Sequence, residues 1–116
     1  MMKTHPAPEG YVTKDLSTIR ELLHPQCIPN LGMSLAEAIV EARHTTAEHR
    51  HSGFDEIYYG LEGMGTLYLN GIPHAFGPHE YYLLPKNTWH YLVAETRLRL
   101  LCICCPGYTH EETSLK

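Results

Sequence analysis

The sequence has few basic residues for its length. Nine Lys and Arg stand against 13 Asp and Glu in 116 residues, so the formal net charge is −4. A nucleic-acid-binding protein needs a basic face to meet the phosphates, and the composition therefore argues against a nucleic-acid partner. No apolar run approaches the roughly 20 residues that cross a bilayer, so we expect no membrane segment. The first ten residues contain no apolar core of a secretory signal, and we expect a cytoplasmic protein.

Cysteine is also scarce, with four residues, and three of them form one cluster of Cys102, Cys104 and Cys105. The cluster contains no CxxC pair, and no second cysteine pair supports a zinc knuckle. In a cytoplasmic protein such thiols are typically reduced and buried. We therefore interpret them as core residues. A soft-metal or redox role for Cys102 and Cys104, which share a strand face, is the alternative.

The chain has no internal repeat and no low-complexity segment, and its length fits one domain. A short helix is predicted at residues 17–23, because Thr18 and Glu21 have capping-box spacing and Pro25 ends the run. The predicted organisation is an N-terminal arm with this helix (residues 1–34), a β-barrel (residues 35–105) and a C-terminal tail (residues 106–116).

The pattern between residues 35 and 105 favours β-strands. Short runs of β-branched and aromatic residues recur at regular spacing, separated by glycine, proline and asparagine. Asn70 and Gly71 form a strong hairpin signal, since both turn positions need a positive φ. Short strands at this spacing indicate an antiparallel sandwich or barrel. The expected strands cover residues 35–41, 49–51, 55–61, 66–69, 74–76, 81–84, 89–93 and 98–104.

Histidine, by contrast, is abundant, with nine residues. His49 and His51 are separated by one residue, so on a strand their side chains point to the same face. Glu56 can return on the neighbouring strand, and His90 comes from a distant one. Imidazole nitrogens with a carboxylate oxygen suit a divalent transition metal such as iron, manganese, nickel, copper or zinc. We therefore predict that one such metal is held by His49, His51, Glu56 and His90.

Two further side chains near Glu56 need an assignment. Asp55 is the rival carboxylate, but it lies on the opposite strand face and cannot reach the same pocket without a bulge. Tyr58 shares the face of Glu56, and we predict that it points into the pocket as a catalytic acid or base, with core packing as the alternative. A ligating imidazole needs a partner for its second nitrogen, and such a partner or a plain surface position is expected for His44, His74 and His79.

The spacing of these residues resembles a known family motif. His49, His51, Glu56 and Gly63 match, without a gap, the first signature motif of the cupin superfamily, HxHxxxxExxxxxxG. Over about residues 35–105 the chain looks like the short single-domain cupins of the mannose-6-phosphate isomerase-like type. The resemblance implies an all-β double-stranded β-helix, or jelly roll, with the metal inside the barrel.

The second cupin motif is matched at its core, where Pro85 is followed five residues later by His90. The resemblance makes this histidine the fourth ligand. The chain departs from both motifs at turn positions that usually carry glycine, where it has Arg43, His79 and Asn87. Asparagine tolerates the left-handed conformation that glycine would supply there, and histidine does so less readily.

The predicted site leaves open positions on the metal for water, substrate or dioxygen. We expect a metal-dependent enzyme, of isomerase or lyase type, acting on a small polar molecule such as a sugar derivative or an oxo- or hydroxy-acid. The alternatives are an oxygen-dependent dioxygenase, a non-catalytic small-ligand binding or sensor module, and a structural protein with an empty pocket. Small cupins commonly pair through sheet edges, so we expect a homodimer, with Trp89 and the N-terminal arm as candidate contacts.

Overall fold

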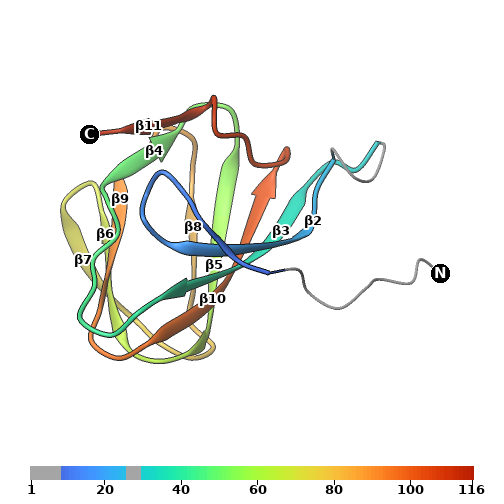
Figure 1. The fold of residues 1–116 in the computed structure, drawn as a ribbon. Helices are drawn as coiled ribbons and strands as arrows, with labels where there is room; N and C mark the ends of the chain where they lie inside the picture. The colour runs from blue at the N-terminus through green and yellow to red at the C-terminus, as the bar shows by residue number, and fades with distance from the viewer. Residues whose placement is uncertain (1–8, 26–29) are drawn as a thin grey trace.

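Two antiparallel sheets face each other and enclose the core (Figure 1). This computed structural model describes residues 9–25 and 30–116. One sheet has the strand order β1-β2-β3-β10-β5-β8 and the other β11-β4-β9-β6-β7. The predicted all-β jelly roll is therefore confirmed. The strands are β1 (Tyr11–Val12), β2 (Thr18–Leu23), β3 (Ser34–Val40), β4 (His49–His51), β5 (Asp55–Glu62), β6 (Gly65–Leu69), β7 (Ile72–Phe76), β8 (Tyr81–Leu84), β9 (His90–Ala94), β10 (Leu98–Cys105) and β11 (Thr113–Leu115).

The core divides into a packed half and a hollow half. Large side chains that are almost completely buried, such as Leu67, Phe76 and Leu84, fill the packed half. Along β3, alternate inward positions carry small side chains, including Ala36 and Ala38. Because small side chains leave space between the sheets, the hollow half can hold a pocket.

The helix predicted for residues 17–23 is wrong. Residues Thr18–Leu23 form β2, which pairs with β3 through Ile19↔Ala38 and Arg20↔Glu37. A helix of this length is marginal in water, whereas pairing with β3 satisfies the backbone polar groups and continues the sheet. No helix occurs in the described ranges, so none there is long and apolar enough to cross a membrane.

Both ends of the chain contribute strands to the sheets. The segment expected as an arm supplies β1 and β2, at one edge of the six-stranded sheet. The segment expected as a tail supplies β11, which lies beside β4 with Thr113 opposite His51 (Figure 1). The described segments before β3 and after β10 therefore take part in building the region around the histidines.

Several turns adopt the left-handed backbone conformation. Asn70 and Gly71 have φ values of 48° and 81°, as the hairpin prediction requires. Arg43, His79 and Asn87 have φ values of 65°, 66° and 67°. The three positions where cupin motifs usually carry glycine thus keep the glycine conformation, although this chain places larger residues there.

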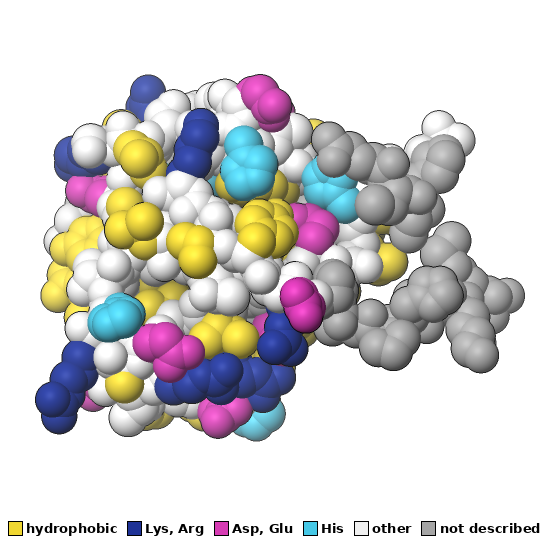
Figure 2. Space-filling view, viewed as in Figure 1, with side chains coloured by type: hydrophobic (Ala, Val, Ile, Leu, Met, Phe, Trp, Pro, Cys, Tyr) yellow, Lys and Arg dark blue, Asp and Glu magenta, His cyan; other side chains and the backbone are white. Residues whose placement is uncertain are grey.

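The outer face of the six-stranded sheet carries alternating charges. Arg99 on β10 lies between Glu37 on β3, at 2.8 Å from Nη2 to Oε2, and Glu62 on β5, at 3.0 Å from Nη1 to Oε2. Arg20 on β2 extends the row with a 3.6 Å contact to Glu37. Figure 2 shows basic and acidic side chains side by side on the face in view, which matches this pairing of opposite charges.

Candidate metal centre

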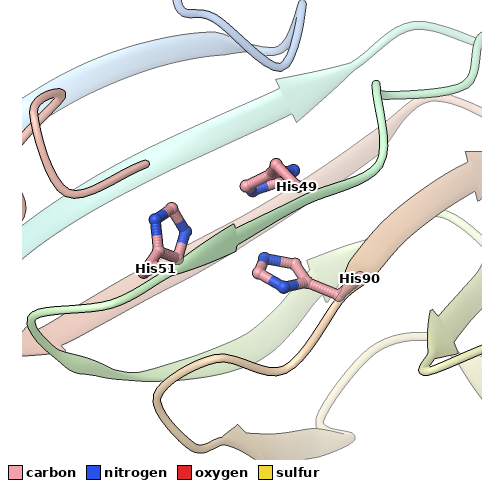
Figure 3. Close-up of side chains that lie close together, drawn as sticks. All are labelled: His49, His51 and His90. Atoms are coloured by element: carbon pink, nitrogen blue, oxygen red, sulfur yellow. The ribbon is translucent and has the colours of Figure 1, made fainter. Parts of the chain in front are cut away.

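The three predicted histidines lie together between the sheets (Figure 3). His49 and His51 project from the same face of β4, and His90 opens β9 directly opposite His49. All three are buried, and their candidate ligand atoms lie within 4.8 Å of one another. Glu56 reaches the same place from β5, across the barrel. The structure therefore brings the three histidines together, with Glu56 beside His51 and His90.

The second ring nitrogen of each histidine has a hydrogen-bond acceptor. Nδ1 of His49 lies 2.8 Å from the carbonyl oxygen of Ala47, and Nδ1 of His90 lies 2.9 Å from that of Thr88. Nδ1 of His51 lies 2.8 Å from Oγ1 of Thr113, whose own proton goes to the carbonyl oxygen of Thr109. Each Nδ1 must then carry the hydrogen, which leaves the lone pair of a neutral ring on Nε2.

These Nε2 atoms face carboxylate oxygens. Nε2 of His51 lies 3.2 Å from Oε1 of Glu56, and Nε2 of His90 lies 3.5 Å from the same oxygen. Oε1 of Glu56 and Nε2 of His90 are buried without a hydrogen-bond partner among the described residues. A lone pair that faces a carboxylate in a buried site needs a proton or a cation between them.

A divalent metal fits this arrangement. Zinc, for example, lies about 2.1 Å from its nitrogen and oxygen ligands, so two ligands at an octahedral or tetrahedral angle are about 3.0–3.4 Å apart. The separations of Glu56 from His51 and His90 are close to that range. His49, His51, His90 and Glu56 are thus the residues that would hold a metal. The three hydrogen bonds from Nδ1 would fix the ring orientations.

The pKa values of His49 and Glu56 are both lowered. Burial lowers the pKa of His49 to about 4, and the neighbouring His90 acts in the same direction. Burial alone would raise the pKa of Glu56, but His51 and His90 outweigh burial and hold it well below its usual value. A neutral imidazole and an ionised carboxylate are the forms that bind a metal.

One residue of the cysteine cluster, Cys104, contacts Glu56 on the carboxylate oxygen that does not face the histidines. The thiol of Cys104 donates to Oε2 of Glu56 over 3.4 Å, which leaves Oε1 directed at the histidines. Burial raises the pKa of Cys104, and the charge of Glu56 raises it further, so the thiol keeps its proton. Cys102 and Cys104 are buried and Cys105 is exposed, all as free thiols. Cys27 lies outside the described residues.

Of the other residues singled out from the sequence, Tyr58 contacts the site and Asp55 points away from it. Tyr58 is buried on β5, and its ring meets that of His90 edge-on with 5.7 Å between centroids. Burial and the charge of Glu56 raise the pKa of Tyr58 well above its usual value. Asp55 points outward and accepts a hydrogen bond from the backbone N–H of Lys86. None of the three site histidines has its Nδ1 atom hydrogen-bonded to His44, His74 or His79.

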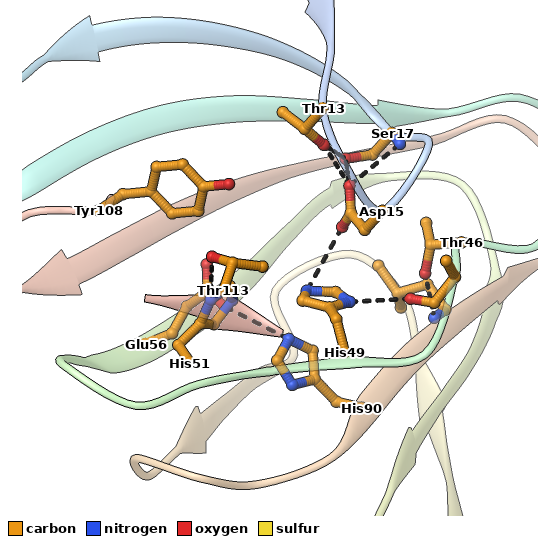
Figure 4. Close-up of polar contacts among 12 residues, drawn as sticks. Thr13, Asp15, Ser17, Thr46, His49, His51, Glu56, His90, Tyr108 and Thr113 are labelled. Carbon is orange, nitrogen blue, oxygen red and sulfur yellow. Dashed lines mark hydrogen bonds and ion pairs between the residues drawn. The ribbon is translucent and has the colours of Figure 1, made fainter. Parts of the chain in front are cut away.

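Sequence reasoning missed Asp15. The turn between β1 and β2 places Oδ2 of Asp15 3.4 Å from Nε2 of His49 (Figure 4). The run Thr13, Asp15, Ser17 has the polar spacing of a capping turn, which was a local signal for an ordered segment. Nothing in the sequence, however, predicted that this turn would fold back over β4.

A pocket lined by His49, His51 and Glu56 opens to solvent. Its walls are largely apolar, with Ala38, Leu92 and Leu100 among the lining residues. Its charged lining groups are acidic: Asp15, Glu21 and Glu56. No Lys or Arg occurs among the described residues that line it.

Comparisons with known proteins agree with this geometry. The family model described as "Cupin domain" matches residues 36–104. An uncharacterized protein from Methanocaldococcus jannaschii is 39% identical over 107 residues, which cover 90% of this chain and 86% of that protein. The L-ectoine synthase of Oceanobacillus iheyensis is 33% identical over 72% of this chain, and the match spans 66% of the synthase.

Among solved structures, an ectoine synthase from P. lautus superposes with a TM-score of 0.74 at 24% identity. The superposition covers 93% of this chain and 80% of that synthase. At this level of identity the match concerns the fold, and it agrees with the two-sheet barrel described above.

Proposed function

This chain belongs to the cupin domain family, and from that premise we propose that it is a metal-dependent enzyme acting on a small polar molecule. The observation that carries the proposal is the cluster of three buried histidines, with Glu56 beside two of them, at a pocket that opens to solvent. A structural role would not require buried lone pairs to face a carboxylate, because such an arrangement is unfavourable without a cation.

The pocket lining narrows the substrate class. A phosphorylated sugar would need cationic side chains around its phosphate, and the described lining residues offer none. An uncharged sugar derivative, or an oxo- or hydroxy-acid that binds through oxygen, requires no such side chains. We therefore favour a small, unphosphorylated substrate.

The chain's own residues have distinct roles in this proposal. A bound divalent metal would supply a Lewis acid that polarises an oxygen of the substrate. Tyr58 keeps its proton, because burial and Glu56 raise its pKa, and we assign it the role of a proton or hydrogen-bond donor to substrate from its position beside His90. The apolar walls exclude water from the reacting groups. Sequence relatives named L-ectoine synthase favour catalysis over ligand binding alone.

Elemental analysis tests the metal. Tag-free protein purified without chelator should contain near-stoichiometric iron, manganese, nickel, copper or zinc, and a His51→Ala variant should lose it. Metal-free protein that cannot be reconstituted, or equal metal in both proteins, would overturn the proposal. Saturable binding of a substrate candidate without turnover, with and without oxygen, would leave a binding module instead of an enzyme.

Replacing Tyr58 by Phe tests the proton donor. We expect the turnover rate to fall by about 10²- to 10⁴-fold, the usual contribution of a positioned acid or base, while metal content stays unchanged. Tyr59→Phe is the matched control, because Tyr59 is next in the chain and its hydroxyl bonds His79 instead. Equal rates in the two variants would remove Tyr58 from the catalytic machinery.

The assembly is a separate proposal. We infer a homodimer, because β8 is an edge strand whose Tyr81 and Leu83 are 70% and 59% exposed. The ring of Trp89, by contrast, is already covered by the guanidinium of Arg50, at 4.8 Å from the ring centroid. Light scattering should return twice the chain mass of 13.2 kDa. A mass of one chain would contradict the dimer.

A further inference from the structure

We propose that Asp15, carried by the turn between β1 and β2, is an additional protein ligand of the metal. Oδ2 of Asp15 lies 3.4 Å from Nε2 of His49, a separation within the range expected for two ligands of one ion. The proposal rests on the metal-dependent function given above and adds a ligand from a part of the chain outside the two cupin motifs.

The tautomer of His49 is the first argument. Its Nδ1 hydrogen goes to the carbonyl oxygen of Ala47, so its Nε2 carries a lone pair. Two acceptors, Nε2 of His49 and Oδ2 of Asp15, then face each other at 3.4 Å. His51 and His90 face Glu56 in the same way. A cation held by the three rings would have Asp15 on the side of His49 and Glu56 on the side of His51 and His90.

The orientation of the carboxylate is the second argument. Oδ1 of Asp15 accepts hydrogen bonds from the Thr13 hydroxyl, from Oγ of Ser17 at 2.8 Å and from the backbone N–H of Ser17 at 3.2 Å. These donors bind one oxygen and leave Oδ2 for the pocket (Figure 4). Glu56 is arranged alike, with Cys104 on one oxygen and the histidines at the other.

The turn that carries Asp15 is itself fixed. The backbone N–H of Ala47, two residues before His49, donates to the carbonyl oxygen of Asp15 at 2.8 Å. The N–H of Thr13 donates to the carbonyl oxygen of Ser17 at 3.0 Å. The side chain of Asp15 is 13% exposed. Hydrogen bonds within the turn and to Ala47 therefore fix the position of the carboxylate, and the turn lines one side of the pocket.

An Asp15→Asn variant tests the ligand against a structural role. Asparagine can keep its side-chain oxygen toward Thr13 and Ser17, and it turns an N–H toward the lone pair of His49. A ligand role predicts that the affinity for Co²⁺, measured by titration of the metal-free protein and followed by visible absorption, falls at least about tenfold. It also predicts that the melting temperature of the metal-free protein stays equal or rises.

The controls separate this inference from the proposed function. Asp55→Asn changes a carboxylate on the opposite face of β5 and should leave Co²⁺ affinity unchanged. If His51→Ala abolishes binding while Asp15→Asn binds as tightly as wild type, only the inference falls. If wild type takes up no Co²⁺, the proposed function falls and the inference with it.

The simplest rival is an ion pair between Asp15 and a protonated His49. That pair predicts a lower melting temperature of the metal-free Asp15→Asn protein with unchanged Co²⁺ affinity, which would overturn the proposal. If the melting temperature and the Co²⁺ affinity both fall, hydrogen exchange distinguishes the ligand role from the ion pair. Slower exchange of the Leu16 amide on adding Co²⁺ to wild type supports a ligand on this turn, and an unchanged rate overturns it.

Discussion

At the scale of single residues, the site depends on atoms that never touch the metal position. The carbonyl oxygens of Ala47 and Thr88 and the hydroxyl of Thr113 take the Nδ1 hydrogens of the three rings. Without them each ring could present a hydrogen to the pocket in place of a lone pair. The candidate ligands can thus be named from a motif, whereas their readiness to bind a metal depends on these acceptors.

Arg43 offers a stability prediction at this scale. Its φ of 65° is unfavourable for a residue with a Cβ atom, by about 1–2 kcal/mol, and its side chain is exposed. Arg43→Gly should therefore raise the free energy of unfolding by up to about 1 kcal/mol, after the extra chain entropy of glycine is subtracted. Urea unfolding measures the change. Arg43→Ala keeps the Cβ atom, so a similar gain in that variant would contradict the backbone explanation.

At the scale of elements, the sequence predicted the strands of the barrel better than the strands that cover it. The alternation and turn signals between residues 35 and 105 are local, and they survive folding because each strand has its own apolar face. The segment Thr18–Leu23 has no such unambiguous signal. Its capping-box spacing favours a helix. The segment becomes a strand because it pairs with β3, and that pairing is not visible in its local sequence.

The same distinction applies to the candidate site. His49, His51 and Glu56 lie within eight consecutive residues, so their geometry follows from strand periodicity and one turn. Asp15 and Thr113 reach the site by pairing between segments distant in the chain. No local pattern encodes which segment closes over which strand, and these two residues could be found only from the fold.

The last strand gives a prediction at the element scale. Thr113 on β11 accepts the Nδ1 hydrogen of His51, and Thr113→Val has a similar shape but removes that acceptor. Loss of an outer partner of a ligating histidine typically weakens metal binding by about 10- to 100-fold, and we expect that loss here. A metal titration of the variant measures it. Ser114→Ala is the control, because Ser114 is next on the same strand and exposed, and its metal affinity should equal that of wild type. Equal metal affinity in wild type and both variants would contradict the role of β11.

At the scale of the whole molecule, the buried histidines make stability depend on pH. Burial lowers the pKa of His49 from 6.5 to about 4, so between these values the unfolded chain binds the proton more readily. The stability of the metal-free protein should therefore be complete above about pH 6.5 and decrease toward pH 4, by at most about 1.4 kcal/mol per pH unit for this one group. The lowered pKa of Glu56 acts in the same direction at more acidic pH.

Urea unfolding at pH 5 and pH 7, in the presence of a chelator, measures this dependence. His49→Gln removes the titrating group, so the variant should show a smaller difference between the two pH values than wild type. An identical difference in both proteins would mean that folding does not shift the pKa of His49.

The position of the site between the sheets has a mechanical consequence. β4 pairs with β9 at one position only, His49↔His90, and Glu56 stands on the opposite sheet. An ion held by these residues would act as a removable cross-link between two layers whose buried cysteines, Cys102 and Cys104, form no disulfide. Its contribution to stability grows with the logarithm of the free ion concentration. Resistance to unfolding would then be set jointly by the amino-acid sequence and by the metal supply of the surroundings.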